Sequence, residues 1–155
     1  AAKFISVPAD ASCIANKSSS MIGYKTTTEV NNSNYEYLQA DTNYFTSLRK
    51  NYDGRTECVF AQLNSNRIAV TVKTTTSIGL DCFNYSSPTL KLFKNGVLRK
   101  TENNYTTFNL GYSYARYARN TPSNYQLLLM GGSLTDAQHA ALNTIVNTFI
   151  TNYVP

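Results

Sequence analysis

The chain has 155 residues, of which only 15% are charged. It contains 12 tyrosines and is also rich in threonine, asparagine and serine. A chain of this length suits one domain; Tyr and Thr favour strands while Asn and Ser favour turns, so we expect a single all-β domain over residues 1–155. The net charge of +5 comes from scattered lysines and arginines without any nucleic-acid-binding motif, which predicts a solvated surface and no nucleic-acid partner; a weak attraction to acidic glycans is the alternative. No apolar run approaches the length of a membrane span, so we expect no membrane insertion.

The first half of the chain contains several short segments with strand character, at residues 4–7, 21–24, 35–39, 57–63 and 67–73. The last two flank Asn64-Ser65-Asn66 and are typical of a hairpin. In the second arm, Ile68, Val70 and Val72 alternate with more polar residues, which is the period-two pattern of a strand buried on one face.

Three cysteines are present, Cys13, Cys58 and Cys82, and the one histidine is His139. No C-x-x-C pair occurs, and a structural zinc ion needs four suitable ligands, so we expect no metal site. Cys58 and Cys82 fall in predicted strands and could pair, but the odd count favours buried thiols over a disulfide scaffold.

A hairpin is the clearest feature of the second half. After a strand over residues 78–83, the segment T-L-K-L-F-K alternates and runs into Asn95-Gly96. That dipeptide tolerates positive φ at both positions, as a two-residue turn requires, and Val97 begins the returning strand. Further strands are expected near residues 108–110 and 125–130.

One amphipathic helix is predicted over about residues 136–151. Thr135 and Gln138 have the spacing of a capping box, and Asp136 suits the positive end of the helix dipole. An apolar stripe predicts the side that docks on the strands, with partner binding as the minor alternative: Leu142, Ile145, Val146, Phe149, Ile150 and Tyr153. Alternation and stripe together predict a common core: Ile68, Val70, Val72, Leu92, Leu128, Ile145 and Phe149.

Three motifs in order, L-K-L-F-K-N-G-V-L, F-N-L-G-Y and S-L-T-D-A-Q-H-A-A-L, carry a family resemblance. Residues 74–151 resemble the end of a LamG-like, concanavalin A-like jelly-roll domain of the kind found in bacteriophage structural proteins. The resemblance implies an antiparallel β-sandwich with one C-terminal α-helix. It rests on Leu92, Phe93, Asn95, Gly96, Leu110, Gly111, Leu134, Thr135, Asp136, Ala137 and Gln138.

Enzymes of that fold include glycoside hydrolases, which need two carboxylates projecting from one strand or from facing strands. No acid-x-acid triplet occurs, although Glu57 with Asp81, or Glu36 with Asp41, could approach in space. Ser-His chemistry would depend on His139, which we expect to be an ordinary, partly exposed helix residue. We therefore expect no enzyme, no catalytic residue and no cofactor, with a hydrolase as the remote alternative.

In one segment, residues 112–119, tyrosines are interspersed with arginines, and both residue types are suited to binding a ligand. Tyrosine offers an apolar face with a hydroxyl, and arginine offers forked donors, a combination that suits sugars or a protein surface. The alternative is that these tyrosines simply pack on a sheet. The candidate ligand-binding residues are Tyr112, Tyr114, Arg116, Tyr117 and Arg119.

The resemblance implies a non-enzymatic surface or adhesion module. The first expected function is that of a phage virion component, namely a capsid decoration or fibre domain that binds glycans. The alternative is a carbohydrate-binding module of a secreted bacterial protein. The expected partners are other virion proteins or cell-surface glycans, and a homo-oligomer is compatible with either. The expected location is the virion surface or the extracellular space.

Overall fold

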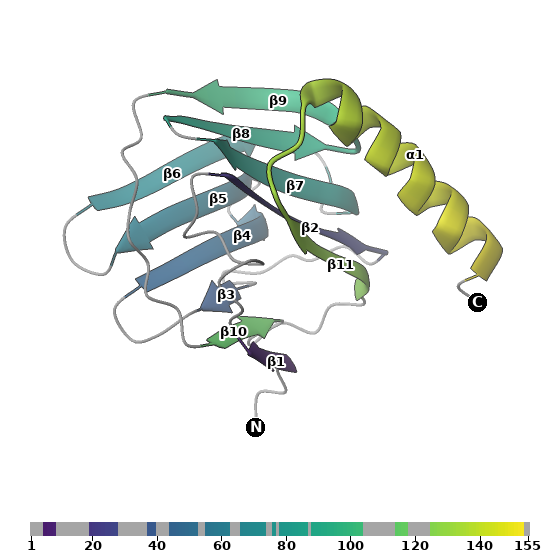
Figure 1. Cartoon of the computed structure of the whole chain (residues 1–155), viewed down its shortest axis with the longest axis horizontal. Helices are drawn as coiled ribbons and strands as arrows, with labels where there is room; N and C mark the ends of the chain where they lie inside the picture. Colours follow the sequence, from purple (N-terminus) through teal and green to yellow (C-terminus); the bar gives the residue numbers. More distant parts are fainter. Residues whose placement is uncertain are drawn as a thin grey trace.

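A computed structural model of the chain describes residues 5–8, 19–27, 37–39, 44–52, 55–62, 66–73, 76, 78–86, 88–103, 114–117 and 125–153. Within these residues the fold is mostly antiparallel strands followed by a C-terminal helix (Figure 1). The elements are β1 (Ile5–Pro8), β2 (Ser19–Thr26), β3 (Tyr37–Gln39), β4 (Tyr44–Tyr52), β5 (Arg55–Gln62), β6 (Asn66–Lys73), β7 (Gly79–Ser86), β8 (Thr89–Lys94), β9 (Val97–Glu102), β10 (Tyr114–Tyr117), β11 (Tyr125–Gly131) and α1 (Asp136–Tyr153).

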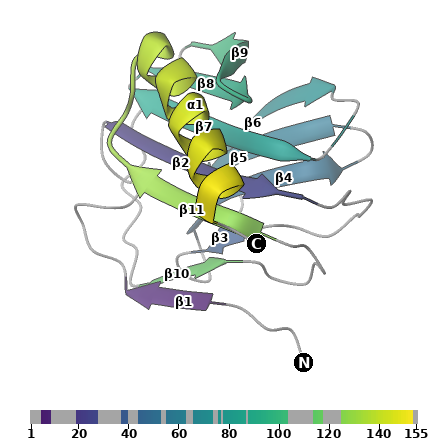
Figure 2. The same cartoon turned by 90° about the vertical axis from the view of Figure 1, so that its right-hand side faces the viewer.

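The strands form a five-stranded sheet in the order β11-β2-β7-β8-β9, a four-stranded sheet in the order β3-β4-β5-β6, and the pair β1-β10. Helix α1 lies across one face of the five-stranded sheet (Figure 2). Strand β6 comes close to β8 and β9, and β4 comes close to β7, so the two larger sheets are neighbours in space.

Both predicted hairpins are confirmed. Strands β5 and β6 pair antiparallel, with Cys58 opposite Val70. Strands β8 and β9 pair on either side of Asn95 and Gly96, whose φ angles are 50° and 77°. The strand expected near residues 108–110 lies outside the described residues.

Strand β4 was not predicted from the sequence. It is nine residues long and pairs with both β3 and β5. Its sequence, Y-F-T-S-L-R-K-N-Y, has aromatic and polar residues at both odd and even positions, so no apolar alternation marks it. Its extended conformation is supported by backbone hydrogen bonding to two neighbours, which a local pattern does not reveal.

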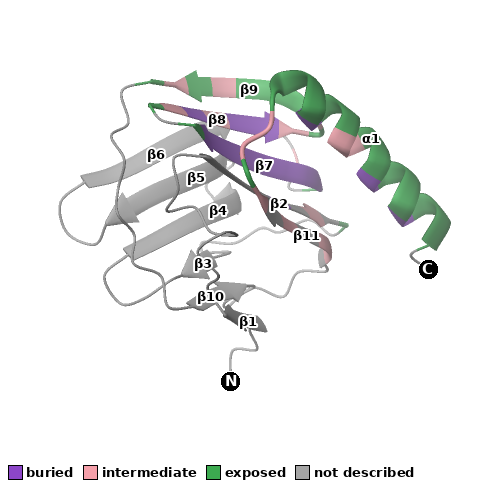
Figure 3. Cartoon of the chain, viewed as in Figure 1, coloured by how far each residue is buried: buried purple, intermediate pink, exposed green. Residues whose placement is uncertain are grey.

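Strand β7 is buried on both faces up to its last residue, and β8 alternates between buried and half-buried residues (Figure 3). On the face toward α1, Leu80, Cys82 and Phe93 form a cluster with two helix residues, Val146 and Ile150. On the opposite face Phe83, Tyr85, Leu90 and Leu92 are each almost fully buried. The predicted burial of Leu92 is confirmed, and the side chains of Ile68, Val70, Val72 and Leu128 lie outside the described ones.

A glycine in β2 makes room for one of the cysteines. Gly23 lies opposite Cys82 in the β2–β7 register, and a Cβ at Gly23 would collide with the Cys82 sulfur. Cys82 is a buried thiol, as the odd cysteine count predicts, and its burial depends on the missing side chain opposite.

The helix start is confirmed. The N–H of Thr135 donates to Gln138 Oε1 at 2.8 Å, and the N–H of Gln138 donates to Thr135 Oγ1 at 3.3 Å, which is a reciprocal capping box. Helix α1 begins at Asp136 and continues beyond the expected end near residue 151.

The predicted apolar stripe of α1 is only half buried. Val146 and Ile150 pack on the sheet, and Leu142 is partly buried beside them. Ile145 is 64% and Phe149 46% exposed, so the prediction that they join the core is wrong. The stripe is wide, whereas a sheet contacts only one flank of a helix laid across it. Tyr153, in the last turn, is also exposed.

Candidate functional site

A polar patch continues the sheet face on which the helix packs. Along β7 the residues on this face change from Leu80 and Cys82 to Asn84 and Ser86, because alternate residues share a face. In the β7–β8 register Asn84 lies opposite Lys91, and Ser86 opposite Thr89. The four polar residues therefore form a floor beside the helix N-terminus, while the apolar residues of the same face lie under the helix.

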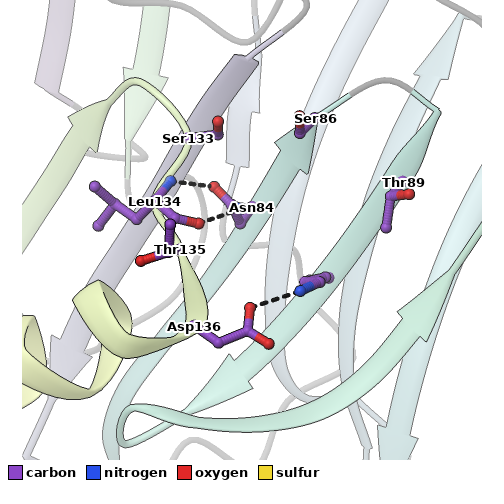
Figure 4. Close-up of a pocket in the computed structure, with 8 residues that line it drawn as sticks. Asn84, Ser86, Thr89, Ser133, Leu134, Thr135 and Asp136 are labelled. Carbon is purple, nitrogen blue, oxygen red and sulfur yellow. Dashed lines mark hydrogen bonds and ion pairs between the residues drawn. The ribbon is translucent and has the colours of Figure 1, made fainter.

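The connection between β11 and α1 forms the wall beside this floor. The Asn84 side chain clamps it, because its Nδ2 donates to the Leu134 carbonyl at 2.9 Å and its Oδ1 accepts from the Leu134 N–H at 2.9 Å. Both ends of the amide are engaged by one residue, which pins the connection to β7 (Figure 4). Asn84 is itself buried.

An ion pair bridges floor and wall. Lys91 Nζ lies 2.6 Å from Asp136 Oδ1, and the Lys91 side chain is the less exposed of the two. The pair joins β8 to the first helical turn, where a carboxylate also faces the positive end of the helix dipole. One positive and one negative group leave the patch without net charge.

These residues line an open pocket of about 580 Å³ (Figure 4). Two of its hydroxyls make hydrogen bonds within the fold: Thr89 Oγ1 donates to Asn103 Oδ1 at 3.0 Å, and Thr135 Oγ1 caps the helix. The pocket can donate and accept hydrogen bonds on several sides. It is lined by Asn84, Ser86, Thr89, Lys91, Ser133, Leu134, Thr135 and Asp136.

His139 lies one turn into the helix from this pocket and was expected to be partly exposed; that prediction is wrong. It is 1% exposed and stacks on Phe93, with ring centroids 3.8 Å apart and planes at 18°. Burial lowers the pKa of His139 to about 4, while Asp136 acts to raise it and Lys91 to lower it further. The imidazole is therefore neutral at physiological pH and serves as packing in the helix contact.

The predicted recognition segment is only partly described. Tyr114, Arg116 and Tyr117 belong to β10, which pairs with β1 so that Arg116 lies opposite Ser6. Tyr112 and Arg119 lie outside the described residues, as do the side chains of the other three. The proposal that the segment binds a ligand stays a prediction.

Sequence reasoning missed the pocket, although a signal was present. Asn84, Ser86, Thr89 and Lys91 are polar at alternate positions of two adjoining strands whose neighbours are apolar. That pattern predicts one face turning polar at one end of a hairpin. The wall residues gave no such signal, because they come from a segment about fifty positions later in the chain.

Of the carboxylates considered as catalytic pairs, only Asp81 has a described side chain, and Glu36 and Asp41 lie outside the described residues. Asp81 lies on the face of β7 away from the helix, is almost fully buried, and pairs with Lys94 Nζ at 2.8 Å. Glu57 lies in β5 of the other sheet. Among the described residues no group of three or more His, Cys, Asp or Glu side chains is placed to hold a metal ion.

Among the described residues, no helix has the length and apolar character needed to cross a membrane.

Comparisons with known proteins find likeness at the level of structure. No protein-family profile matches the chain, and no curated protein sequence matches it. The binding domain of botulinum neurotoxin DC, solved in complex with rat synaptotagmin II, superposes with a TM-score of 0.64 at 10% identity, covering 83% of this chain and 36% of that one.

Two other solved structures are similar over most of this chain. Domain 4 of AbnA, a GH43 extracellular arabinanase from Geobacillus stearothermophilus, in complex with arabinotriose, has a TM-score of 0.58 at 19% identity, covering 81% of this chain and 65% of that one. The Ruminococcus gnavus IT-sialidase CBM40 bound to α2,3-sialyllactose has a TM-score of 0.57 at 15% identity, covering 81% and 82%. At these identities the likeness shows that this chain shares the fold of these domains, a fold consistent with a jelly roll.

Proposed function

We propose that the chain is a non-enzymatic carbohydrate-binding module that works outside the cell. The observation that carries the proposal is the shared fold with two domains solved with bound sugars, arabinotriose and sialyllactose, and with a toxin binding domain. The polar pocket beside the helix supports it, since sugars are recognised through hydroxyl groups that both donate and accept.

We also infer that the two larger sheets are the layers of a jelly-roll sandwich within one domain of residues 1–155. Phe83, Tyr85, Leu90 and Leu92 are buried on the face away from α1, so another layer must cover them. The closeness of β6 to β8 and β9 supports the four-stranded sheet as that layer.

The virion setting and a homo-oligomer rest on the sequence resemblance alone and stay predictions. The tyrosine and arginine segment with Tyr112, Tyr114, Arg116, Tyr117 and Arg119 is likewise a proposed contact surface. Acidic glycans would suit its arginines, and protein surfaces its tyrosines.

A glycan array probed with the folded chain tests the proposed function. The array should include neutral pentose oligosaccharides and sialylated oligosaccharides, and positive spots should be followed by calorimetry. We expect saturable binding that is lost when the chain is unfolded in urea. A blank array from a chain with a folded spectrum by circular dichroism would overturn the proposal.

Variants then separate the tyrosine and arginine segment from the rest of the surface. If that segment makes the contact, Arg116→Ala or Arg119→Ala should weaken binding of acidic sugars, and added salt should weaken it further. A Tyr114→Ala, Tyr117→Ala double variant with wild-type binding would remove the segment from the site.

A further inference from the structure

We propose that the pocket between β7, β8 and the start of α1 binds one unit of a neutral sugar, with Lys91 and Asp136 as its hydrogen-bonding groups. This inference rests on the proposed function and names its site and its ligand class. The observation that carries it is an open pocket of about 580 Å³ with an ion pair at its edge. That volume lies within the roughly 300–1,000 Å³ typical of small-molecule pockets.

The chemistry of the ion pair matches a pair of neighbouring hydroxyls. Lys91 has three N–H donors, and within the described residues only Asp136 Oδ1 is a partner for them. The Asp136 carboxylate accepts through two oxygens, and Oδ2 has no partner among the described residues. A vicinal diol offers one oxygen to the ammonium and one O–H to the carboxylate, and each contact is a charge-assisted hydrogen bond.

The opposite charges of Lys91 and Asp136 favour a neutral sugar over an acidic one. A carboxylate or sulfate on a sugar would gain from Lys91 but would meet Asp136 at hydrogen-bonding distance from that lysine. The two effects oppose each other, so an acidic sugar gains little here over a neutral one. The net charge of +5 acts at longer range and is screened by salt, so it does not reverse this local balance.

The pocket is positioned by groups whose hydrogen bonds are made within the protein and not to the ligand. Both ends of the Asn84 amide are hydrogen-bonded to Leu134, so Asn84 positions the β11–α1 connection and does not bind the ligand. The capping box of Thr135 and Gln138 fixes the first helical turn, which carries Asp136. Little has to become ordered when a ligand binds, which favours affinity.

The test is a titration of the uniformly ¹⁵N-labelled chain, followed by heteronuclear NMR, with arabinotriose as the neutral probe and α2,3-sialyllactose as the acidic probe. We expect arabinotriose to shift the amides of Ser86, Leu134 and Asp136 in a saturable way and sialyllactose to bind them more weakly. Shifts from sialyllactose that saturate earlier at the same amides would overturn the neutral class.

Two pairs of variants sharpen the test. Lys91→Met removes the ammonium but keeps the aliphatic stem, and should lower arabinotriose affinity about tenfold or more, as loss of a charge-assisted hydrogen bond implies. Asp136→Asn leaves a net positive pocket, so arabinotriose affinity should fall while sialyllactose affinity rises. The half-buried pair Lys100 and Glu102 on β9, also 2.6 Å apart, is the matched control, and Lys100→Met and Glu102→Gln should leave both affinities within about twofold.

The outcomes separate this inference from the proposed function. Sugar binding that leaves the pocket amides unmoved, or that survives Lys91→Met unchanged, overturns the pocket while the carbohydrate-binding proposal stands. No binding of any sugar on the array or in the titration overturns both. The dispersed amide spectrum of each variant verifies that it is folded, and the wild-type titration decides the site even where a variant fails to fold.

Discussion

Asn95 does more than adopt the turn conformation that its sequence context predicts. Its φ of 50° lies in the left-handed region, and its side-chain Oδ1 accepts the N–H of Leu80 at 2.9 Å. Its own N–H donates to the Leu80 carbonyl at 2.7 Å. One residue therefore turns the β8–β9 hairpin and ties it to the start of β7.

Replacing Asn95 with Ala should lower the free energy of unfolding by about 2–3 kcal/mol, because it leaves a partly buried N–H without its acceptor and because alanine tolerates the left-handed conformation less well than asparagine. Urea denaturation measures the loss. Asn95→Asp is the control, since aspartate keeps an acceptor and tolerates this conformation, and it should cost less than about 1 kcal/mol. Equal losses in the two variants would mean that the side-chain bond contributes nothing.

His139 predicts a pH dependence of stability with a definite sign. Its pKa falls from the model-peptide value of 6.5 to about 4 in the fold, because burial against Phe93 disfavours the charged ring. Above pH 6.5 the ring is neutral in both states and has no effect. Between about pH 6.5 and 4 the unfolded chain takes up a proton that the folded chain does not, so stability falls, by up to about 3 kcal/mol.

The measurement is urea unfolding of the wild type and of His139→Phe at pH 7, 5 and 4. Carboxylates titrate in both proteins, so the difference between the two isolates the imidazole. The wild type should lose more stability than the variant as the pH falls through this window. Parallel pH profiles would show that His139 is protonated in the fold without cost.

At the scale of elements, helix α1 is attached to the sheet by the apolar contacts of one flank and by polar side-chain contacts at its start and in its middle. The N-terminal turn is joined to β8 through Lys91 and Asp136, and Lys25 of β2 donates to Asn147 Oδ1 at 2.6 Å. Gly96, in the β8–β9 turn, allows the hairpin to approach the helix, since a Cβ there would press on Asn143 and the backbone of Ala140. Close approach brings the buried flank onto Phe93 and Cys82.

Two isoleucines on the same helix give a matched comparison. Ile150 is 9% exposed and packs on the sheet, whereas Ile145 is 64% exposed. Ile150→Ala should lower the free energy of unfolding by about 2–5 kcal/mol through lost burial and a cavity, while Ile145→Ala should cost within about 0.5 kcal/mol. Thermal or urea unfolding compares them. A larger loss for Ile145→Ala would place the docked flank on the other side of the helix.

At the scale of the molecule, two of the carboxylates whose side chains are described are each held by a lysine. Asp81 is committed to Lys94 inside the fold, and Asp136 to Lys91 at the pocket. We expect no release of arabinose from arabinotriose in a reducing-sugar assay in which a true arabinanase serves as positive control. Turnover above background that disappears in Asp81→Asn or Glu57→Gln, with the variants folded, would contradict the non-enzymatic proposal.

Local pattern determined several parts of this protein from the sequence alone. The Asn95-Gly96 turn, the Thr135 and Gln138 cap and the β5–β6 hairpin were predictable, because turn chemistry, capping and short-range alternation act between residues close in the chain. The prevalence of strands followed by one helix followed from the same local signals.

Tertiary structure decided what the local patterns left open. Strand β4 depends on pairing with two neighbouring strands. The way the helix packs on the sheet determines which flank of its apolar stripe is covered, so Ile145 is exposed and His139 is buried. The pocket exists because Asn84 and Lys91 meet Leu134 and Asp136 across 50 and 45 positions of sequence. Contacts over such separations depend on how the chain packs as a whole, so alternation could mark the polar floor of the site but only the fold could supply its wall.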